Sequence, residues 1–490
     1  LLLFVLIVAF IIGYALFINK IKGLPPGPPP LPLLGNTLQL DVDMGKVLTK
    51  WKAQYGNVFT VWMPAGPSVV VADHELLQEH LVRDSDKFAE RINPTQLMRL
   101  IAGGENGLVF NDNAIWKDQR RFAMHALRNV GFNNATTQST VIQYAHEIIA
   151  RWKVQGANRN PIDITHGCTV GVANIIWQHV FGRTLVYDDP LIARVKHLAE
   201  ESIASMGHPL VMALETIPAI RHLKHIDSPI KRLSKANKEF LGLLENEIEL
   251  VIKNFNEDEE PKCYAEAFLQ EMSKRKARGD DEGSFTHEQL VIACGDLWAA
   301  GFETTVTALR MTFHFMINNP EVLKKAQEEI DAKIGQRPIH VEDQKMLHYI
   351  NAIIQEVFRL NSSSISFARR VSAPVNIQGY DIPIGTGVIP QFSLIHSDPQ
   401  NFERPDYFCP ERHLNEQGEF VKDSRITPFS VGKRSCLGEG LARMELFLFF
   451  TNFIQHLTFS SVSKVPPELK LLQSLARTPL PYQVIVESRS

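Results

Sequence analysis

The chain contains little cysteine and no long flexible spacer, and each absence limits what it can be. Its five cysteines among 490 residues are scattered and form no Cys-x-x-Cys pair. This usage favours a reducing compartment and argues against a disulfide framework. No His-Glu-x-x-His motif or Cys/His cluster has the spacing of a zinc site. No Ser/Gly linker, repeat or low-complexity block follows the first 35 residues, so we expect residues 36–490 to form a single domain.

An excess of charge of either sign is also missing. The formal net charge is −3, with 44% hydrophobic and 21% charged residues. This composition is ordinary for a globular protein that buries a large core. The balanced charge provides no general attraction to phosphate backbones, so we expect no nucleic-acid partner.

The N-terminal segment 1–18 carries no charge and is almost wholly apolar. As a helix it would reach about 27 Å, close to the hydrocarbon thickness of a bilayer. Lys20 and Lys22 follow it, which favours a cytoplasmic side for the rest of the chain. We therefore expect a single transmembrane anchor. The alternative, a cleaved signal peptide, lacks a small-residue cleavage site. The proline-rich run 24–30 makes 19–35 a stiff, basic hinge.

The body of the chain has mainly helical periodicity. Apolar positions recur with a period near 3.6 from residue 76 to 358. Two short β-like runs, 58–63 and 68–72, flank a Pro-Ala-Gly-Pro turn and predict a hairpin. Glycines and prolines between 375 and 390 predict short strands and turns. The fold class expected is therefore mainly α with a minor β portion.

One long helix is predicted in the middle of the chain. Thr286-His-Glu-Gln289 has the form of a capping box, and an apolar run follows it to about Asn318, where Pro320 should stop the helix. Gly301 inside this helix costs about 1 kcal/mol relative to alanine. We expect a flat ligand that passes close to Gly301 to offset this cost.

Glu303 and Thr304 place a carboxylate and a hydroxyl at adjacent positions of that helix. An acid and an alcohol about 100° apart around a helix can relay protons to a reacting oxygen. The alternative is structural: Glu303 is then a surface charge, and the Thr304 hydroxyl bonds back to its own helix.

Cys436 has neighbours that suit a thiolate. Arg434 lies two residues before it, and a helical pattern from 437 to 453 begins directly after it. A cation and the free N–H groups of a helix N-terminus both favour the ionised sulfur. Gly432 and Gly438 allow the backbone to approach a flat, bulky group. Together these features suggest an axial ligand to haem iron, against the simpler alternative of a buried, inert cysteine.

The run that contains Cys436 resembles the haem-ligand loop of the cytochrome P450 superfamily, Phe-x-x-Gly-x-Arg-x-Cys-x-Gly. Its fixed positions are matched by Phe429, Gly432, Arg434, Cys436 and Gly438. The resemblance extends over about residues 25–490 and is closest to animal microsomal members of the second family. It implies the cytochrome P450 fold, a helix-rich part and a smaller sheet region enclosing haem b.

The resemblance also assigns roles on the central helix. The run Ala300-Gly-Phe-Glu303-Thr304 is similar to the family's (Ala/Gly)-Gly-x-(Asp/Glu)-Thr motif. It implies that Thr304 and Glu303 are the acid–alcohol pair for oxygen activation and that Ala300 faces haem and substrate. Asp296, one helical turn earlier, is expected to touch either the substrate or the helix over the pocket.

The haem propionates should be held by a few cationic and aromatic residues. Trp116 and Arg120 resemble the family's Trp-x-x-x-Arg pair, which serves the propionates, and Arg434 is the second cation. Arg369 matches the position of the cation for the other propionate, with Arg370 as the adjacent alternative. Arginine suits this role because it pairs with carboxylates through two parallel hydrogen bonds.

Two segments resemble the structural core of the family on the thiolate side of the haem. Glu356 and Arg359 match a Glu-x-x-Arg pair, and Arg412 matches the arginine that completes it from a downstream segment. The alternative is an ordinary surface ion pair. His413 stands where many relatives carry Phe, and we expect it to change local packing without loss of chemistry.

The function implied is a haem-thiolate monooxygenase that inserts one oxygen atom from O2 into a lipophilic xenobiotic, fatty acid or steroid. Electrons would come from NADPH through NADPH-cytochrome P450 reductase, with cytochrome b5 as a further candidate partner. The expected location is the endoplasmic reticulum membrane, with the catalytic domain on the cytosolic side. Two alternatives stay open, a reductase-independent enzyme that rearranges peroxides and a non-catalytic haem-binding sensor.

Two surfaces are predicted around this chemistry. A basic docking face for the reductase is formed by Lys117, Arg121, Lys433 and Arg443, although these could equally be scattered solvated charges. The substrate pocket should be lined from about 97–110, 202–214, 297–304 and 364–367, which are largely apolar or small.

Overall fold

The computed structural model describes residue 13 and residues 23–31, 34–40, 44–63, 66–92, 97, 101, 104, 106–132, 134–206, 208, 211, 229–279, 283–362, 366–463, 465, 467–469, 471–473 and 477–489. The predicted anchor, 1–18, lies outside these residues apart from Gly13. No helix within the described ranges is long and apolar enough to cross a bilayer. The predicted pocket segments 97–110, 202–214 and 364–367 are described only in part.

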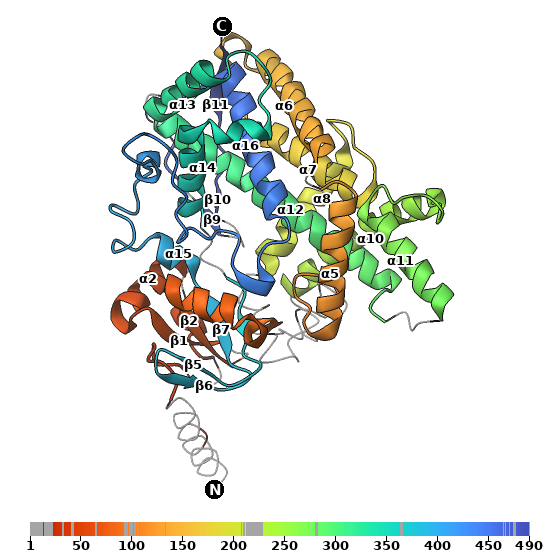
Figure 1. Cartoon of the computed structure of the whole chain (residues 1–490), viewed down its shortest axis with the longest axis vertical. Coiled ribbons are helices and arrows are strands. Elements are labelled where there is room, and N and C mark those ends of the chain that lie inside the picture. Colours follow the sequence, from red (N-terminus) through yellow and green to blue (C-terminus); the bar gives the residue numbers. More distant parts are fainter. Residues whose placement is uncertain are drawn as a thin grey trace.

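The structure is mainly helical, as predicted, with a small sheet region at one end (Figure 1). The helices are α2 (Met44–Tyr55), α3 (His74–Leu77), α5 (Asn113–Asn129), α6 (Ala135–Gln155), α7 (Thr165–Phe181), α8 (Pro190–Met206), α10 (Pro229–Asn254), α11 (Tyr264–Arg278), α12 (His287–Asn318), α13 (Pro320–Lys333), α14 (His348–Leu360), α15 (Phe392–His396) and α16 (Glu439–His456). Shorter helical turns used below are η2 (Gln78–Arg83), η7 (Pro410–His413) and η8 (Gly432–Arg434).

The sheet region is built around one five-stranded sheet with the order β1-β2-β7-β4-β3. Strands β2 and β7 are parallel, and the other neighbours are antiparallel. Three two-stranded pairs, β5–β6, β8–β11 and β9–β10, complete the β portion. The strands are β1 (Val58–Met63), β2 (Gly66–Val71), β3 (Glu90–Arg91), β4 (Arg369–Arg370), β5 (Val375–Ile377), β6 (Tyr380–Ile382), β7 (Gly387–Pro390), β8 (Leu457–Ser461), β9 (Leu471–Gln473), β10 (Arg477–Pro479) and β11 (Val484–Ser488).

Helix α12 crosses the middle of the molecule and packs against α7 and α16 (Figure 1). Its limits confirm the prediction, since Thr286 caps it by accepting a hydrogen bond from the Gln289 backbone N–H at 3.1 Å and Pro320 follows its last residue. The second hydrogen bond of the predicted capping box, from the Gln289 side chain back to the cap residue, is absent. The Gln289 side chain does not return to the cap but bonds Gly107 in a distant loop.

Gly301 of α12 also lies in close contact with α7, a reason for glycine that the sequence did not indicate. A Cβ at Gly301 would lie 2.7 Å from Cδ1 of Ile176 on α7. Carbon atoms do not approach this closely without displacement. Gly301 is therefore required by the close packing of α12 against α7, where its missing side chain leaves room for Ile176.

Helix α16 begins at Glu439, two residues later than predicted, and ends at His456. Leu437 and Gly438 belong instead to the turn that leads from Cys436 into the helix, and Gly438 is the N-cap residue. This helix is buried almost throughout its length, with Phe447, Phe449 and Phe453 fully covered. It therefore fixes the position of the Cys436 turn relative to the core.

Candidate active site

Cys436 lies in a tight turn that the rest of the fold holds from two sides. Its backbone N–H donates to the carbonyl of Phe429 at 2.8 Å, which closes the loop. Gly432 has φ +74°, and a Cβ there would overlap the carbonyl oxygen of Leu81 in η2. Phe429 packs edge-on against Phe358 of α14 at 5.2 Å. The motif residues thus shape the turn that presents the sulfur.

The Cys436 side chain is exposed, although protein atoms surround much of it. It is the only exposed cysteine of the five, yet burial is the largest influence on its pKa, which it raises. The side chain is thus reachable by solvent, although neighbouring protein atoms crowd the sulfur. Hydrogen bonds from the Gly438 and Glu439 N–H groups and the charge of Arg120 lower the same pKa. The helix N-terminus therefore points at the sulfur, as predicted.

The centre of α12 has one accessible stripe. Ala300 and Thr304, four residues apart, are exposed, whereas Phe302 and Thr305 are buried. The Thr304 hydroxyl donates to the Ala300 carbonyl at 2.7 Å, which is the back-bonded conformation considered above. The two predicted residues therefore share one face that borders open space.

Glu303 occupies a different side of α12 from Thr304. Its carboxylate accepts from the Thr307 hydroxyl at 3.4 Å, and Thr307 lies 3.1 Å from the hydroxyl of Thr478. Burial and the negative charge of Glu200 raise the pKa of Glu303, and the cations Lys196 and Arg310 oppose this rise. Glu303 is thus disposed to hold a proton near Thr304 without contacting it directly.

Four arginines gather beside the Cys436 turn, of which Arg120 is half-buried and the other three are buried. Arg434 donates to the carbonyls of Ala89 and Asn111, both at 2.7 Å. Arg120 donates to the Ser435 carbonyl at 2.6 Å, and Arg369 donates to the Ser430 hydroxyl at 3.0 Å. The fourth, Arg91, is brought in by strand pairing with Arg369. Trp116 lies under Arg434, with the guanidinium 3.5 Å from the ring centroid.

Within the part of the chain that the structure describes, none of these four arginines forms an ion pair; the charges of Asp112 and Glu90 act on Arg434, but both carboxylates pair with Arg370. Burial and the other arginines lower the pKa of Arg434 to about 8, and they also lower those of Arg91 and Arg369. Arginine nevertheless stays charged in proteins. An anion is therefore needed here, and the cluster suits a group with two carboxylates.

Unsatisfied hydrogen-bond donors support the same conclusion. Nη1 of Arg369, Nη1 of Arg434 and Nε1 of Trp116 are all buried without a hydrogen-bond partner. Leaving a buried donor unpaired costs about 1–3 kcal/mol, and more for a charged group. The three unpaired donors belong to residues that the resemblance assigns to haem propionates. The residues present therefore fit haem, whose iron the sulfur of Cys436 would bind.

Arg91 was missed by sequence reasoning, and Arg370 was the weaker of two alternatives. Arg91 stands in no motif that marks it, and only the pairing of β3 with β4 places it beside Arg369. Arg370 points elsewhere, since it pairs with Glu90 at 2.8 Å and with Asp112 at 3.0 Å. The geometry therefore favours Arg369 over Arg370 as a cation that faces the site.

The structural triad is present and has a fourth member. Arg359 forms two hydrogen bonds with Glu356, at 2.7 and 2.8 Å, and Arg412 adds one at 3.1 Å. His413 Nε2 lies 2.8 Å from the second Glu356 oxygen. Burial would raise the pKa of Glu356, but hydrogen bonds from Arg359 and His413 lower it to about 2. His413 is thus part of the polar network, beyond the packing change predicted for it.

Asp296 contacts a loop of the chain. Its Oδ2 accepts hydrogen bonds from the backbone N–H groups of Leu108 at 2.6 Å and Val109 at 3.0 Å. Burial raises the pKa of Asp296 to about 6 even though these two bonds lower it. The described contacts therefore assign Asp296 to the loop over the pocket.

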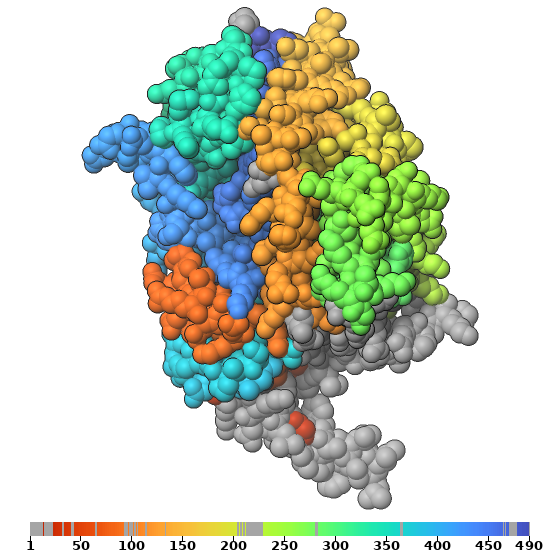
Figure 2. Space-filling view, turned by 45° about the vertical axis from the view of Figure 1, so that its right-hand side comes forward, coloured from red at the N-terminus to blue at the C-terminus, as the bar shows by residue number. Residues whose placement is uncertain are grey.

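The predicted basic docking face is largely paired within the chain. Lys433 contacts Asp86, Arg443 pairs with Glu439 at 2.8 Å, and Arg121 with Asp118 at 3.1 Å. Figure 2 shows the orange surface of α5 and α6 running beside blue C-terminal segments, and the bond from Arg120 to Ser435 joins α5 to the Cys436 turn.

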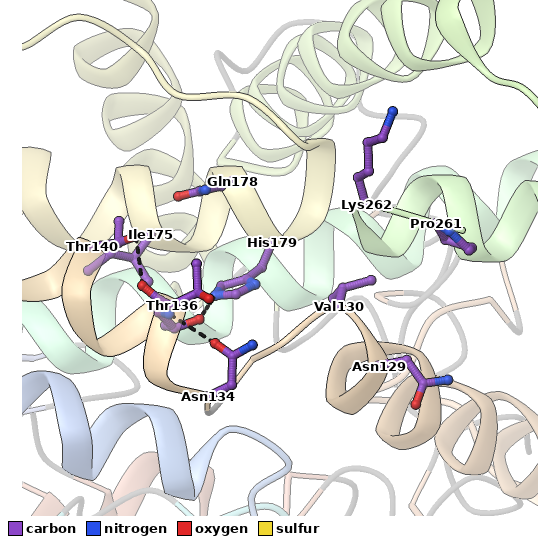
Figure 3. A pocket seen from close by; sticks show the side chains of 11 residues that line it. Asn129, Val130, Asn134, Thr136, Thr140, Ile175, Gln178, His179, Pro261 and Lys262 are labelled. Atoms are coloured by element: carbon purple, nitrogen blue, oxygen red, sulfur yellow. Dashed lines mark hydrogen bonds between the residues drawn. The ribbon is translucent and has the colours of Figure 1, made fainter. Parts of the chain in front are cut away.

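A separate polar cavity of about 260 Å³ lies between α5, α6 and α7 (Figure 3). The imidazole of His179 borders it and lies 3.1 Å from the Thr137 hydroxyl, while Asn134 caps α6. Burial lowers the pKa of His179 to about 4, so this histidine is neutral. No predicted site residue lines the cavity, which is therefore distinct from the Cys436 site.

A thiol at a helix N-terminus beside a cluster of arginines that need a dianion defines the class of haem-thiolate proteins. Comparison with known proteins supports the same class. The profile of the family described as Cytochrome P450 matches residues 25–486. Probable cytochrome P450 CYP36A1 of Caenorhabditis elegans is 36% identical over 99% of both chains. Cytochrome P450 2D10 of Mus musculus is 34% identical over 95% of this chain and 92% of its own.

A third relative, Cytochrome P450 2M1 of Oncorhynchus mykiss, is 32% identical over 99% of this chain and 97% of its own. The chain belongs to the cytochrome P450 family. It is accordingly a P450 monooxygenase with a haem cofactor, a redox partner and a lipophilic substrate, and the resemblance noted in the sequence is confirmed.

Proposed function

We propose that this chain is a membrane-anchored monooxygenase that binds haem b through Cys436 and inserts one oxygen atom from O2 into a xenobiotic, fatty acid or steroid. The observation that supports this most strongly is the buried arginine cluster with unpaired donors on Trp116, Arg369 and Arg434. Bound haem supplies the redox chemistry that activates dioxygen. Arg91, Arg120, Arg369 and Arg434 hold the propionates by charge-assisted hydrogen bonds.

The protein's own residues hold the thiolate in place, leave space for haem and substrate, and supply protons. Gly438 and Glu439 N–H groups stabilise the Cys436 thiolate, and Gly432 and Phe429 fix the turn that presents it. Ala300 presents a small side chain on the accessible stripe of α12, which leaves space for haem and substrate. Thr304 holds a hydroxyl on the same stripe, and Glu303, whose pKa burial raises, is the proposed proton donor on the neighbouring side of α12.

The proposed partners follow from this chemistry. NADPH-cytochrome P450 reductase delivers electrons, and cytochrome b5 is a further candidate donor. The charge of Lys117 on α5 acts on Asp86, which Lys433 beside the Cys436 turn contacts, and an acidic reductase would compete with Asp118 for Arg121. Steering of this kind weakens as ionic strength rises.

The proposed organisation is a single catalytic domain from 36 to 490, a hinge at 19–35 and an anchor at 1–18 in the endoplasmic reticulum membrane, with the domain on the cytosolic side. Its support is the uncharged apolar run 1–18, followed by Lys20 and Lys22. Within the hinge, Thr60 bonds the Pro25 and Pro26 carbonyls at 2.8 and 3.0 Å. The proline run is thus tied to the sheet region.

Reconstitution tests the proposal. The full chain, loaded with haem, is mixed with reductase and NADPH, and NADPH oxidation and product formation are followed across a panel of lipophilic compounds. Product that depends on reductase supports the proposal. Conversion of organic peroxides without reductase would instead support a peroxide-rearranging enzyme. Stable haem binding with no product across the panel would support a sensor.

A further inference from the structure

The loop 107–111 is fastened to α12 by two side chains. Gln289 accepts from the Gly107 N–H at 2.8 Å and donates to the Gly107 carbonyl at 3.4 Å. Asp296 takes the next two N–H groups, those of Leu108 and Val109. The backbone N–H groups of Gly107, Leu108 and Val109, three consecutive residues, therefore all bond to side chains of α12.

The opposite side of the same loop is held by the arginine cluster. Arg91 donates to the Val109 carbonyl at 3.2 Å, and Arg434 donates to the Asn111 carbonyl at 2.7 Å. Phe110 between them packs edge-on against Phe367 at 5.4 Å. The loop thus connects the residues that would hold haem to the helix that would hold oxygen chemistry.

The fastening residues share a face with the accessible stripe of α12. Gln289, Asp296, Ala300 and Thr304 are separated by seven, four and four residues. These spacings keep side chains on one side of an α-helix. The loop therefore covers this face up to Asp296, and the accessible part begins one turn later at Ala300.

The contact between the loop and α12 leaves no room for a side chain at position 107. Gly107 has φ +95°, and a Cβ there would lie 2.5 Å from Oδ2 of Asp296 and 2.9 Å from Cγ2 of Ile292. Gln289 itself is 1% exposed, so breaking its bonds leaves a buried amide without compensation from water.

We propose that Gln289 is a positioning residue that fixes the 107–111 loop as a wall of the substrate space and thereby limits the size of ligand admitted beside Ala300. This inference rests on the proposed function, because the wall matters only if haem and substrate occupy that space. Asp296 holds the middle of the wall, and Gln289 holds the end that is farther from the arginine cluster.

The first test measures the fastening itself. In Gln289→Met the exchange of the Gly107 amide hydrogen should become about thirtyfold faster, the effect of losing two neutral hydrogen bonds. Gln327→Met is the matched control, since Gln327 is also buried and donates to two backbone carbonyls, those of Ile454 and Leu457, at 3.1 Å. Unchanged exchange at Gly107 would overturn the proposal. This measurement does not require bound haem.

The second test measures size selection with imidazole and 4-phenylimidazole, which are followed by the shift of the haem absorption band. In Gln289→Met the affinity for 4-phenylimidazole, relative to imidazole, should rise at least threefold, while imidazole affinity stays within twofold. A ratio that is unchanged, or that moves in the other direction, would contradict the proposal. If the wild-type protein binds no haem, the proposed function fails instead, and the exchange measurement still decides the fastening.

A second variant disrupts the same contact between the loop and α12 by a substitution in the loop. Gly107→Ala forces a Cβ against Asp296 and should reproduce the size effect of Gln289→Met. Gly104→Ala is its control, because Gly104 also has a positive φ, +118°, but no described atom lies within 4 Å of its Cβ position. An equal effect in both glycine variants would show backbone strain to be the cause and would refute the role given to the Gln289 contact.

Discussion

Replacing His413 by Phe, the residue of many relatives, should weaken the thiolate side of the site at acid pH. His413 lies 2.8 Å from Glu356, and Gln355 Nε2 lies 3.1 Å from the other imidazole nitrogen. The Gln355 amide nitrogen is fixed by the Val421 carbonyl at 3.3 Å, so it donates to the imidazole. In this arrangement Nδ1 of His413 faces the Gln355 amide, and Nε2–H donates to the Glu356 carboxylate.

The expected magnitude follows from what remains after the substitution. A hydrogen bond to a charged group contributes about 1.5–3 kcal/mol. Glu356 keeps Arg359 at 2.8 Å on the same oxygen, and Gln355 keeps the Val421 carbonyl. Because neither partner of His413 is left unpaired, we expect a loss near the lower limit, about 1.5 kcal/mol.

The effect should depend on pH with a definite sign. The pKa of Glu356 is held at about 2, below its usual value, so its contribution to stability is complete above about pH 4.5 and is lost as pH falls toward 2. Without His413 this pKa rises toward its usual value, so Glu356 contributes less stability above pH 4.5, and this smaller contribution is completely lost at a higher pH than in the wild type. The assay is the pH midpoint at which the reduced, CO-bound protein loses its red-shifted thiolate Soret band.

The His413→Phe variant should show a higher acid midpoint than the wild type. His179→Phe is the control, because His179 is also a buried histidine with a hydrogen-bond partner, but that partner is Thr137 on α6 and not Glu356. An unchanged midpoint in His413→Phe, or the same shift in both variants, would refute the reasoning.

Three further changes have expected outcomes. Arg369→Leu should weaken haem retention at least tenfold, measured by haem transfer to apomyoglobin, whereas Arg370→Leu should change it less than threefold, because Arg370 already pairs with Glu90 and Asp112. Thr304→Ala should keep NADPH oxidation but divert it from product, and unchanged coupling would show that the relay assignment is wrong. Asp296→Asn should raise the free energy of unfolding at pH 7.5 by up to about 3 kcal/mol, since burial raises this pKa to about 6 and the ionised form then costs stability. That gain, followed by urea unfolding, should roughly halve at pH 5.

Local signals in the sequence located the main elements well. Thr286 and Pro320 set the limits of α12 because capping and helix termination depend on a few neighbouring residues. The Cys436 turn was likewise predictable in part, since Gly432 has φ +74°, a local backbone conformation that favours glycine. The paired members Glu356 and Arg359 lie three residues apart on one helix.

Contacts between distant segments were not predictable in the same way. Gly301 is explained by Ile176 on α7, and the Gln289 side chain leaves its expected cap for a loop 182 residues away. Arg91 joins the arginine cluster only because β3 pairs with β4. In each case the sequence provides the residue type, but its partner is chosen by tertiary packing.

The most direct test of the central claim concerns Cys436 itself. The full chain is expressed with haem, reduced and exposed to CO, and its absorption spectrum is compared with that of Cys436→Ala. The wild type should show the red-shifted Soret band of a thiolate-ligated haem, and the variant should lack it. A wild-type spectrum without this band, or a variant that retains it, would contradict the assignment of Cys436 as the iron ligand.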